Sequence, residues 1–259
     1  MNKNINLFKR LCHPYLKMRV YLQECDDIDD FLNECIKYCK TSKIPILEVI
    51  TSRTDAGLTR YTSKSVGTFI IDLKQDMESI WKSFKQQNRT QIRFAQKKGV
   101  SIRQANMDDL KEWWGIYLET ASRGKFVKQR YEMVEELFKN TEISRLFVAA
   151  IDDKIAAGIF ILTHHTPLYW IGGSLPEYWN LRPNNLIHWE IIKWAHSCGY
   201  AFYDMGGAVV NEEHGPTRFK EQFGGRYIEN YRYRIDVNLW AAQVVDMMVK
   251  VRYGVRKGH

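Results

Sequence analysis

NNLIHWEIIKWAHSCGYAFYDMGG, residues 184–207, followed after a loop by RFKEQFGG, residues 218–225, is the stretch that decides the fold. Its first part places apolar residues at the three-four spacing of an amphipathic helix, which starts after Pro183 and ends at Gly199. A strand over 201–205 follows and ends at a pair of glycines. A helical turn over 219–223 and a closing strand over 226–237 complete this part of the chain.

The residues before this stretch predict a mixed α/β chain. Helices are expected at 26–40, 76–98, 107–120 and 128–139, and strands at 44–50, 67–73, 100–104, 145–151, 154–162 and 168–172. The segment 51–65 is expected to be a loop, and the tail over 239–253 a helix. From residue 107 onward the order is helix, helix, three meandering strands, helix, strand, short helix and strand, which suits several α/β folds.

The ordered set of motifs resembles the FemAB family. Residues 184–225 are similar to the second GNAT-like domain of that family, in which a helix ends in A-x-x-x-G-Y and is followed by Y-D-x-G-G and F-K-x-x-F-G-G. The upstream stretches TFIIDL (68–73), NRTQIRFAQKKGV (88–100) and YLETASRGKF (117–126) also resemble the family, in the same order. The resemblance therefore spans about Asp26 to Arg234.

The resemblance implies a GNAT-like acyltransferase fold and a peptidoglycan-building function. FemAB proteins move an amino acid from aminoacyl-tRNA to an amine of a cell-wall peptide precursor. Because only about 25 residues precede the first matching segment, the expected organisation is a partial N-terminal GNAT-like domain over 1–104 with a basic helix. A complete C-terminal GNAT-like domain is expected over 105–237, and a basic C-terminal helix over 238–259.

Aminoacyl transfer requires an unprotonated acceptor amine, an ester carbonyl held near it and a stabilised oxyanion. The sequence shows no Ser-His-Asp or Cys-His nucleophile motif, which favours direct attack by the amine. Lys220 matches the lysine of the family's F-K motif and is the expected oxyanion stabiliser; a surface lysine is the alternative. Phe219 is expected beside the reacting group or in the core.

Asp204 is a candidate to accept or orient the proton of the amine, and capping of the loop backbone is its alternative role. Tyr203 is its neighbour on the same strand, so the two side chains are expected on opposite faces of the sheet. Arg123 is expected between two helices, matches the arginine of the family's T-x-x-R-x-x-F stretch, and would clamp a phosphate or form a structural ion pair. Arg218 is a second candidate for phosphate.

The start of the helix at 184 is a further candidate binding region, with Tyr178, Asn184 and Asn185 around its exposed amides. Enzymes that bind coenzyme A use a glycine-rich turn at this place, whereas this chain has WNLRPNN, residues 179–185, in which Pro183 also lacks an amide. A tRNA-borne donor is therefore favoured over coenzyme A, and no bound cofactor is expected.

The balance of charge favours a polyanionic partner. The chain of 259 residues has a net charge of +8, an isoelectric point near 9.1 and 45% hydrophobic residues. Lys85, Arg89, Arg93 and Lys97 recur every four residues along the expected helix 76–98, and form either a nucleic-acid-binding stripe or a solvated face.

No metal site is predicted, because the five cysteines and the histidines at 164, 165, 188 and 196 form no ligand pattern. Residues 1–10 lack the apolar core of a secretory signal, and no apolar run approaches the roughly 20 residues of a membrane span. A cytoplasmic protein is therefore expected. The basic tail 239–259 would pack on the body through Trp240 and its methionines, or would touch a membrane that carries a lipid-linked acceptor.

Three functional hypotheses remain open from the sequence. The leading one is an aminoacyltransferase that uses aminoacyl-tRNA, with a cell-wall peptide precursor as acceptor. The second is a GNAT-type N-acyltransferase that uses an acyl thioester such as acyl-coenzyme A. The third is a non-catalytic protein that binds tRNA or another nucleic acid through the cationic stripe.

Overall fold

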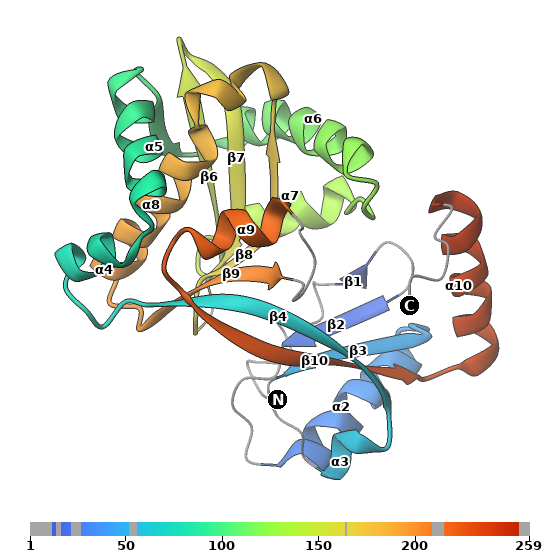
Figure 1. Ribbon diagram of the computed structural model, residues 1–259. Coiled ribbons are helices and arrows are strands. Elements are labelled where there is room, and N and C mark those ends of the chain that lie inside the picture. The colour runs from blue at the N-terminus through green and yellow to red at the C-terminus, as the bar shows by residue number, and fades with distance from the viewer. Residues whose placement is uncertain are drawn as a thin grey trace. The chain divides into compact units, whose positions relative to one another are not determined.

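A computed structural model of the chain describes residues 12–13, 17–21, 27–51, 56–163, 165–208 and 215–253 (Figure 1). These residues form two compact units. The first contains the described residues up to 66, residues 126–133 and the described residues from 229; the second contains 67–125 and 134–228. The long strands β4 (Thr62–Asp72) and β10 (Arg226–Asp236) each contribute residues to both units.

The boundaries of these two units differ from the domain boundaries expected from the sequence. Residues 67–104 belong with the second unit instead of ending a first domain, because β4 pairs with β9 (Phe202–Ala208) from Gly67 onward. Residues 239–253 belong with the first unit, where their helix packs on Ile46.

The first unit is a small sheet with helices. Its elements are β1 (Cys12–His13), β2 (Lys17–Tyr21), α2 (Ile28–Thr41), β3 (Ile46–Thr51), α3 (Ala56–Thr59) and α10 (Leu239–Tyr253). The strand order is β1-β2-β3-β10, with β2 parallel to β3 and β10 antiparallel to it. The helix predicted at 26–40 is confirmed as α2, and its three-four pattern places Leu32, Cys35 and Cys39 in the core.

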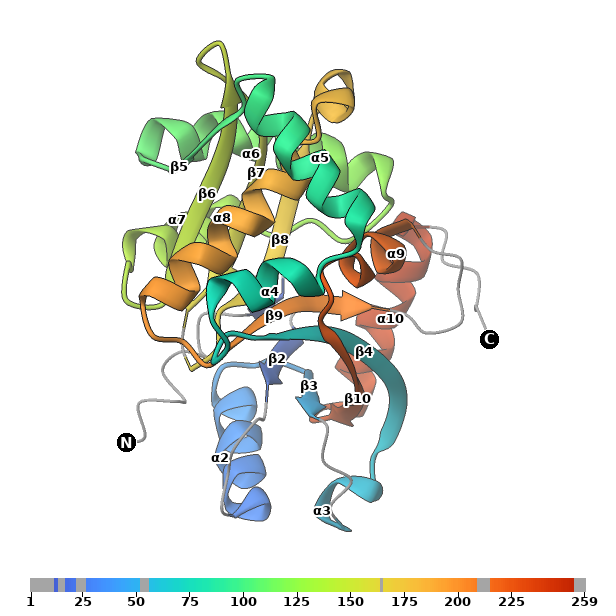
Figure 2. The same ribbon diagram turned by 60° about the vertical axis from the view of Figure 1, so that its left-hand side comes forward.

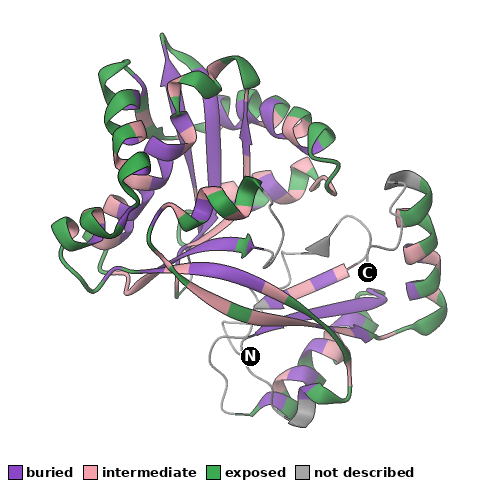
Figure 3. Cartoon of the chain, viewed as in Figure 1, coloured by how far each residue is buried: buried purple, intermediate pink, exposed green. Residues whose placement is uncertain are grey.

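Helix α10 packs by one face only. Ala242 and Val245 join Ile46 in a small buried cluster, which stabilises the helix against the sheet of its own unit. Trp240 (75% exposed), Met247 (61%) and Val251 (83%) lie at helical spacing on the other side. Most of the ribbon of α10 is accordingly coloured as exposed in Figure 3. The expectation that Trp240 and the methionines supply the packing face is therefore wrong, because smaller side chains do so.

The second unit combines elements expected in the first domain, up to residue 104, with most of those expected in the C-terminal GNAT-like domain. They are α4 (Met77–Ser83), α5 (Gln86–Lys97), β5 (Ser101–Gln104), α6 (Met107–Arg123), most of α7 (Tyr131–Lys139), β6 (Ser144–Ile151), β7 (Lys154–Leu162), β8 (Leu168–Ser174), the 3-10 helix η1 (Pro176–Leu181), α8 (Pro183–Ser197), β9 and α9 (Gly215–Glu221). The strand order is β4-β9-β8-β7-β6-β5. Neighbouring strands are antiparallel except β8 and β9, which are parallel.

Helices cover both faces of this sheet (Figures 1 and 2). On one face, Phe147 and Ala149 of β6 join Ile187 and Ile191 of α8 in the main hydrophobic core, and α5 packs on α8. On the other face lies α6, whose fully buried Trp113 sits so close to Gly158 of β7 that a Cβ there would meet the indole at 2.4 Å. Because successive side chains of each strand point to opposite faces of the sheet, the strands pack against helices on both sides.

The prediction of a single helix over 76–98 is wrong, because the helical conformation is interrupted at Phe84 and Lys85. Both residues have extended backbone, with ψ of 142° and 140°. Phe84 is buried in a cluster of aromatic rings, and the N–H of Lys85 donates to the carbonyl oxygen of Gln222 (3.0 Å). These contacts with a distant part of the chain outweigh the helical pattern of the segment.

Smaller differences concern the ends of elements. The expected loop 51–65 contains α3 and the first residues of β4, and η1 was not expected. β9 continues through the glycine pair to Ala208, so Asp204 lies inside the strand and not at its end. Arg123 is the last residue of α6 and does not lie between two helices. Residues 209–214, part of the expected polar loop, fall outside the described residues.

Candidate active site

The side chain of Lys220 is buried inside the second unit. It is 7% exposed, although it lies on the short helix α9. Its ammonium donates a hydrogen bond of 2.6 Å to the carbonyl oxygen of Gly207 and lies 5.2 Å from the ring centroid of Tyr169 on β8. Lys220 is therefore not a surface lysine; its part in a reaction stays a prediction.

Asp204 forms a buried hydrogen-bonded group with Thr68 of β4. The Thr68 hydroxyl donates to Oδ1 of Asp204 and also lies 2.9 Å from the carbonyl oxygen of Gly206, while the Gly206 N–H donates to the same carboxylate at 2.8 Å. β4 and β9 are neighbouring antiparallel strands, which brings together two residues that are 136 positions apart. Asp204 thus holds the backbone at Gly206 and is close enough to Lys220 for the two charges to influence one another.

The glycine at 206 is required by the backbone. Its φ is +71°, a left-handed conformation that residues with a Cβ rarely adopt, and a Cβ there would lie 2.4 Å from the carbonyl oxygen of Tyr169. This turn aims the next carbonyl, that of Gly207, at the Lys220 ammonium. The Y-D-x-G-G motif therefore supplies the backbone carbonyl that the Lys220 ammonium contacts.

A histidine and aromatic rings form the other side of this site. His188 of α8 is 1% exposed, and its Nδ1 lies 2.9 Å from the hydroxyl of Tyr203. Its ring packs against Tyr169 at 5.1 Å, Phe219 at 5.6 Å and Phe223 at 5.2 Å between centroids. Phe219 therefore lies beside the histidine, in a cluster of aromatic rings.

The electrostatics follow from this burial. Burial lowers the pKa of Lys220 to about 8, and the nearby Asp204 opposes that shift. Burial likewise raises the pKa of Asp204, against the hydrogen bonds of Thr68 and Gly206 and the charge of Lys220. Burial and the Lys220 charge lower the pKa of His188 to about 3, so this ring is neutral near pH 7. Burial raises the pKa of Tyr169 to about 12.

This arrangement can stabilise a negative charge that develops during a reaction. An ammonium has three donors. One donor of Lys220 goes to Gly207, and no other hydrogen-bond acceptor contacts the ammonium among the described residues. A cation with unused donors in a site of low dielectric can stabilise an oxyanion. Asp204, whose raised pKa brings it closer to neutrality, is a suitable proton carrier beside it.

The residues expected to bind phosphate form a second, separate group. The Arg123 guanidinium donates to Glu119 (3.0 Å) and to the carbonyl oxygen of Ser174 (3.0 Å), and it lies 4.9 Å from the ring centroid of Trp179. Asn184 donates to the hydroxyl of Ser174 (3.3 Å). Arg123 and Asn184 are thus brought together, but by contacts that involve none of the residues around Lys220.

The remaining candidates of this region have different positions. Tyr178 is partly buried on η1 and packs on the main core. Asn185 is 4% exposed, and its amide donates to the side chains of Asn88 (2.8 Å) and Gln91 (2.9 Å), which ties α8 to α5. Arg218 is exposed on α9. The Asn185 amide is therefore already used within the protein.

The four basic residues expected to form one stripe have separate roles. Lys85 precedes α5 and pairs with Glu221 at 3.0 Å. Arg89 donates to the carbonyl oxygens of Lys82 (3.0 Å) and Phe84, and so closes the end of α4. The Arg93 guanidinium lies 5.3 Å from the ring centroid of Trp81, and Lys97 is exposed. Arg89, Arg93 and Lys97 thus lie four residues apart along α5, and the break at Phe84 places Lys85 at the N-cap of this helix.

Sequence reasoning missed Thr68, Tyr169 and His188 as parts of the site. Thr68 begins the TFIIDL stretch, but only the pairing of β4 with β9 shows its contact with Asp204. His188 is three residues before Ile191 and seven before Ala195, so it lies on the buried face of α8. This helical spacing could have predicted its burial from the sequence. Within the residues that the structure describes, no cluster of His, Cys, Asp or Glu is arranged to hold a metal ion.

The layered α/β unit is that of an acyltransferase of the GNAT type. The family model described as Acetyltransferase (GNAT) domain matches residues 82–221, which is more than half of the chain. The chain therefore belongs to this family, as the sequence resemblance implied for the fold. No curated protein matches the sequence.

Solved structures resemble the chain over most of its length. FemX is 15% identical, with a TM-score of 0.64 over 88% of this chain and 82% of that one. The C-terminal domain of a putative lysylphosphatidylglycerol synthetase from Agrobacterium fabrum is 11% identical, with a TM-score of 0.62 over 94% and 84%. L-PGS from Bacillus licheniformis is 13% identical, with a TM-score of 0.57 over 94% and 84%. At these identities the likeness concerns the fold, and it confirms the FemAB-like architecture.

Proposed function

We propose that this acyltransferase moves an amino acid from aminoacyl-tRNA to an amine of a cell-wall peptide precursor or a similar acceptor. The observation that carries the proposal is the buried ammonium of Lys220, held beside Asp204 and the Gly206–Gly207 turn. A desolvated cation stabilises an oxyanion much better than an exposed one does. The likeness of the fold to FemX supports the same class of reaction.

The reaction proceeds in two bond changes. The neutral acceptor amine attacks the ester carbonyl carbon, a C–N bond forms, and the carbonyl oxygen becomes an oxyanion that the Lys220 ammonium stabilises. When the oxyanion collapses, the C–O bond to the tRNA ribose breaks. The proton lost by the amine passes by way of Asp204 to the leaving ribose oxygen, so the amide and free tRNA are formed without another reactant.

The start of α8 favours a donor other than coenzyme A. Arg182 precedes this helix in a left-handed conformation with φ of 58°, and Pro183 supplies no amide. The N–H groups of Asn185 and Leu186 already lie 3.2 and 3.5 Å from the carbonyl oxygen of Arg182. Few free amides therefore remain for a pyrophosphate, which supports aminoacyl-tRNA as co-substrate in the cytoplasm.

The acceptor is proposed to be lipid-linked, with α10 as a peripheral contact to the membrane. None of the described helices has the length and apolar character needed to cross a bilayer. The exposed face of α10 carries Trp240, Met247 and Val251. Lys250 and Arg252 are basic residues near the end of this helix, and Arg256 and Lys257 come after it in the sequence. An apolar face with flanking cations suits an anionic lipid surface. A synthetase of lysylphosphatidylglycerol, a lipid, is among the proteins of similar fold.

The test is transfer of label from a mixture of radiolabelled aminoacyl-tRNAs to a panel of amine acceptors that includes cell-wall peptide precursors. We expect Lys220→Ala to lower the rate at least about 100-fold, the usual loss on removing one oxyanion donor. The control is Lys111→Ala, an exposed lysine of α6 that pairs with Asp108, and it should keep the wild-type rate.

Different results in these assays would support the other two functional hypotheses. An equal rate in Lys220→Ala, with circular dichroism unchanged, would remove Lys220 from the mechanism. Transfer from acetyl-coenzyme A and none from aminoacyl-tRNA would make the protein a conventional N-acyltransferase. Tight tRNA binding with no transfer to any acceptor would favour a non-catalytic nucleic-acid-binding protein.

A further inference from the structure

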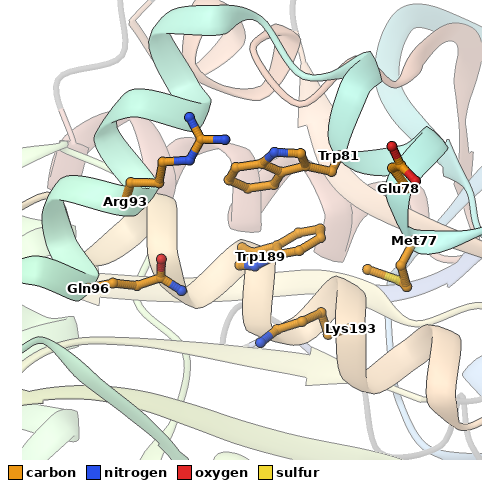
Figure 4. A pocket seen from close by; sticks show the side chains of 7 residues that line it. All are labelled: Met77, Glu78, Trp81, Arg93, Gln96, Trp189 and Lys193. Atoms are coloured by element: carbon orange, nitrogen blue, oxygen red, sulfur yellow. The ribbon is translucent and has the colours of Figure 1, made fainter.

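A pocket of about 440 Å³ opens between three helices of the second unit (Figure 4). Its volume falls in the range of about 300–1,000 Å³ typical of small-ligand sites. The pocket is lined by Met77, Glu78 and Trp81 of α4, Arg93 and Gln96 of α5, and Trp189 and Lys193 of α8. None of these side chains belongs to the group around Lys220.

Two indole rings form the apolar part of the pocket. The centroids of Trp81 and Trp189 are 4.8 Å apart, with 51° between the ring planes. The rings already contact one another, so a flat ligand does not insert between them and contacts instead the parts of the rings that remain exposed. Both side chains are partly exposed, and Phe84 contacts both from the inner side.

Two cations flank these rings. The guanidinium of Arg93 lies 5.3 Å from the Trp81 centroid, and the ammonium of Lys193 lies 5.8 Å from the Trp189 centroid. The carboxylate of Glu78 is bound by Lys82 at 2.6 Å, and Lys193 is paired with Glu190 at 2.8 Å. Arg93 has no carboxylate partner in the part of the chain that the structure describes. The pocket therefore presents aromatic faces and one unneutralised guanidinium.

We propose that this pocket binds one nucleotide of single-stranded RNA, with the base against the exposed parts of the two tryptophan rings and the adjoining phosphate on Arg93. A base has a flat π-face for stacking, and a guanidinium binds phosphate bidentately. Bases inside a duplex are covered by their neighbours, so an unpaired nucleotide is the form that fits. This inference rests on the proposed use of aminoacyl-tRNA and names a contact for its RNA.

The pocket is connected to the candidate active site through packed side chains. Trp189 follows His188 on α8. Phe84 lies 5.5 Å from Trp189 and 5.3 Å from Phe223, whose ring is 5.2 Å from His188. RNA held at the pocket is therefore anchored to the same rigid helix that supports the site of Lys220.

The experiment is a fluorescence titration of the full chain with a four-nucleotide single-stranded RNA, without any aminoacyl group. We expect binding to quench tryptophan emission and Trp81→Ala to weaken it roughly fivefold to a hundredfold, the loss of one stacked base. Trp81→Phe keeps an aromatic ring and should retain most of the affinity, which separates stacking from misfolding. Arg93→Gln should reduce the slope of log affinity against log salt by about 0.7.

The controls use side chains outside the pocket. Trp240→Ala removes another exposed tryptophan, on α10, and Lys111→Gln another exposed cation, on α6; neither should change the affinity. Equal binding of an abasic oligonucleotide, or of an RNA duplex, would overturn the proposal. Self-association abolished by Trp81→Ala, with no RNA binding, would assign the pocket to a second copy of the chain and overturn it as well.

The two proposals fail independently. RNA binding that depends on Trp81 and Arg93 in a protein without transfer activity would support the pocket and contradict the aminoacyl transfer. Transfer that is lost in Lys220→Ala but has unchanged KM for tRNA in Trp81→Ala and Arg93→Gln would contradict the pocket alone.

Discussion

The ammonium of Lys220 donates a 2.6 Å hydrogen bond to the carbonyl oxygen of Gly207, and this bond links α9 to the glycine turn of β9. The turn exists because Gly206 adopts a left-handed backbone conformation that a Cβ would not fit. Two motifs that are separate in the sequence thus form one structural group.

The rate of transfer should fall as the pH rises through about 8. Burial lowers the pKa of Lys220 to about 8, so the ammonium that stabilises the oxyanion is lost above that value. Lys220→Arg keeps a cation at all these pH values, and its residual activity should lack this falling limb. The measurement is kcat between pH 6 and 10. A wild-type rate that stays constant to pH 10 would contradict an ammonium in this role.

Thr68→Val should reduce both activity and stability. The Thr68 hydroxyl bonds to Asp204 and lowers the pKa of that carboxyl, so its loss moves Asp204 further toward the neutral acid. We expect a rate at least about tenfold lower and a cost of about 1–3 kcal/mol in the free energy of unfolding. Thr68→Ser keeps the hydroxyl and serves as the control; if the valine and serine variants behave alike, the hydrogen bond has no part.

Much of the fold was predictable because its signals are local. α2, α8, α10 and the three strands β6, β7 and β8 were predicted within about two residues from helical or alternating patterns. The break between α4 and α5 was not, because it depends on Gln222, which lies 137 residues after Lys85. The helical pattern of 76–98 contains no sign of that contact.

The residues of the candidate site likewise fall into those with local sequence signals and those placed by distant contacts. Lys220, Phe219 and Asp204 were found because they lie in short motifs near each other in the sequence. Thr68 was missed because its contact with Asp204 depends on strand pairing across 136 residues. The cationic stripe was predicted from spacing alone, and the hydrogen bonds of the Arg89 head group to the end of α4 require the broken helix. Charge spacing cannot distinguish a free cation from one that binds backbone carbonyls.

His188 should make the protein less stable in acid. Burial and the charge of Lys220 lower its folded pKa to about 3 from the ordinary 6.5. Below pH 6.5 the unfolded state therefore binds a proton that the folded state does not, and stability falls by about 1.4 kcal/mol per pH unit from this group. Urea unfolding between pH 4 and 6.5 should show a slope one proton steeper for the wild type than for His188→Gln. Equal slopes would contradict a neutral buried ring.

Helix α10 should bind anionic membranes through its exposed face. Trp240, Met247 and Val251 are each more than 60% exposed, and residues 250–257 contain four basic residues, Lys250, Arg252, Arg256 and Lys257. We expect the protein to co-sediment with vesicles that contain phosphatidylglycerol, less in high salt, and Trp240→Ser to weaken this binding. Trp179→Ser, on η1, is the control because it removes another exposed tryptophan. Equal binding to neutral vesicles in all variants would contradict a role for the basic residues.

Two glycines of the second unit should respond to alanine in opposite directions. A Cβ at Gly173 of β8 would lie 2.8 Å from Cα and 2.9 Å from N of Tyr117, and this backbone of α6 cannot rotate away. Gly173→Ala should therefore cost about 1–3 kcal/mol in the free energy of unfolding. Gly115, inside α6, has open space at the same place, so Gly115→Ala should stabilise by up to about 1 kcal/mol through its higher helix propensity. Chemical denaturation of both variants provides the measurement. Destabilisation by Gly115→Ala, or none by Gly173→Ala, would contradict the close packing of α6 on β8.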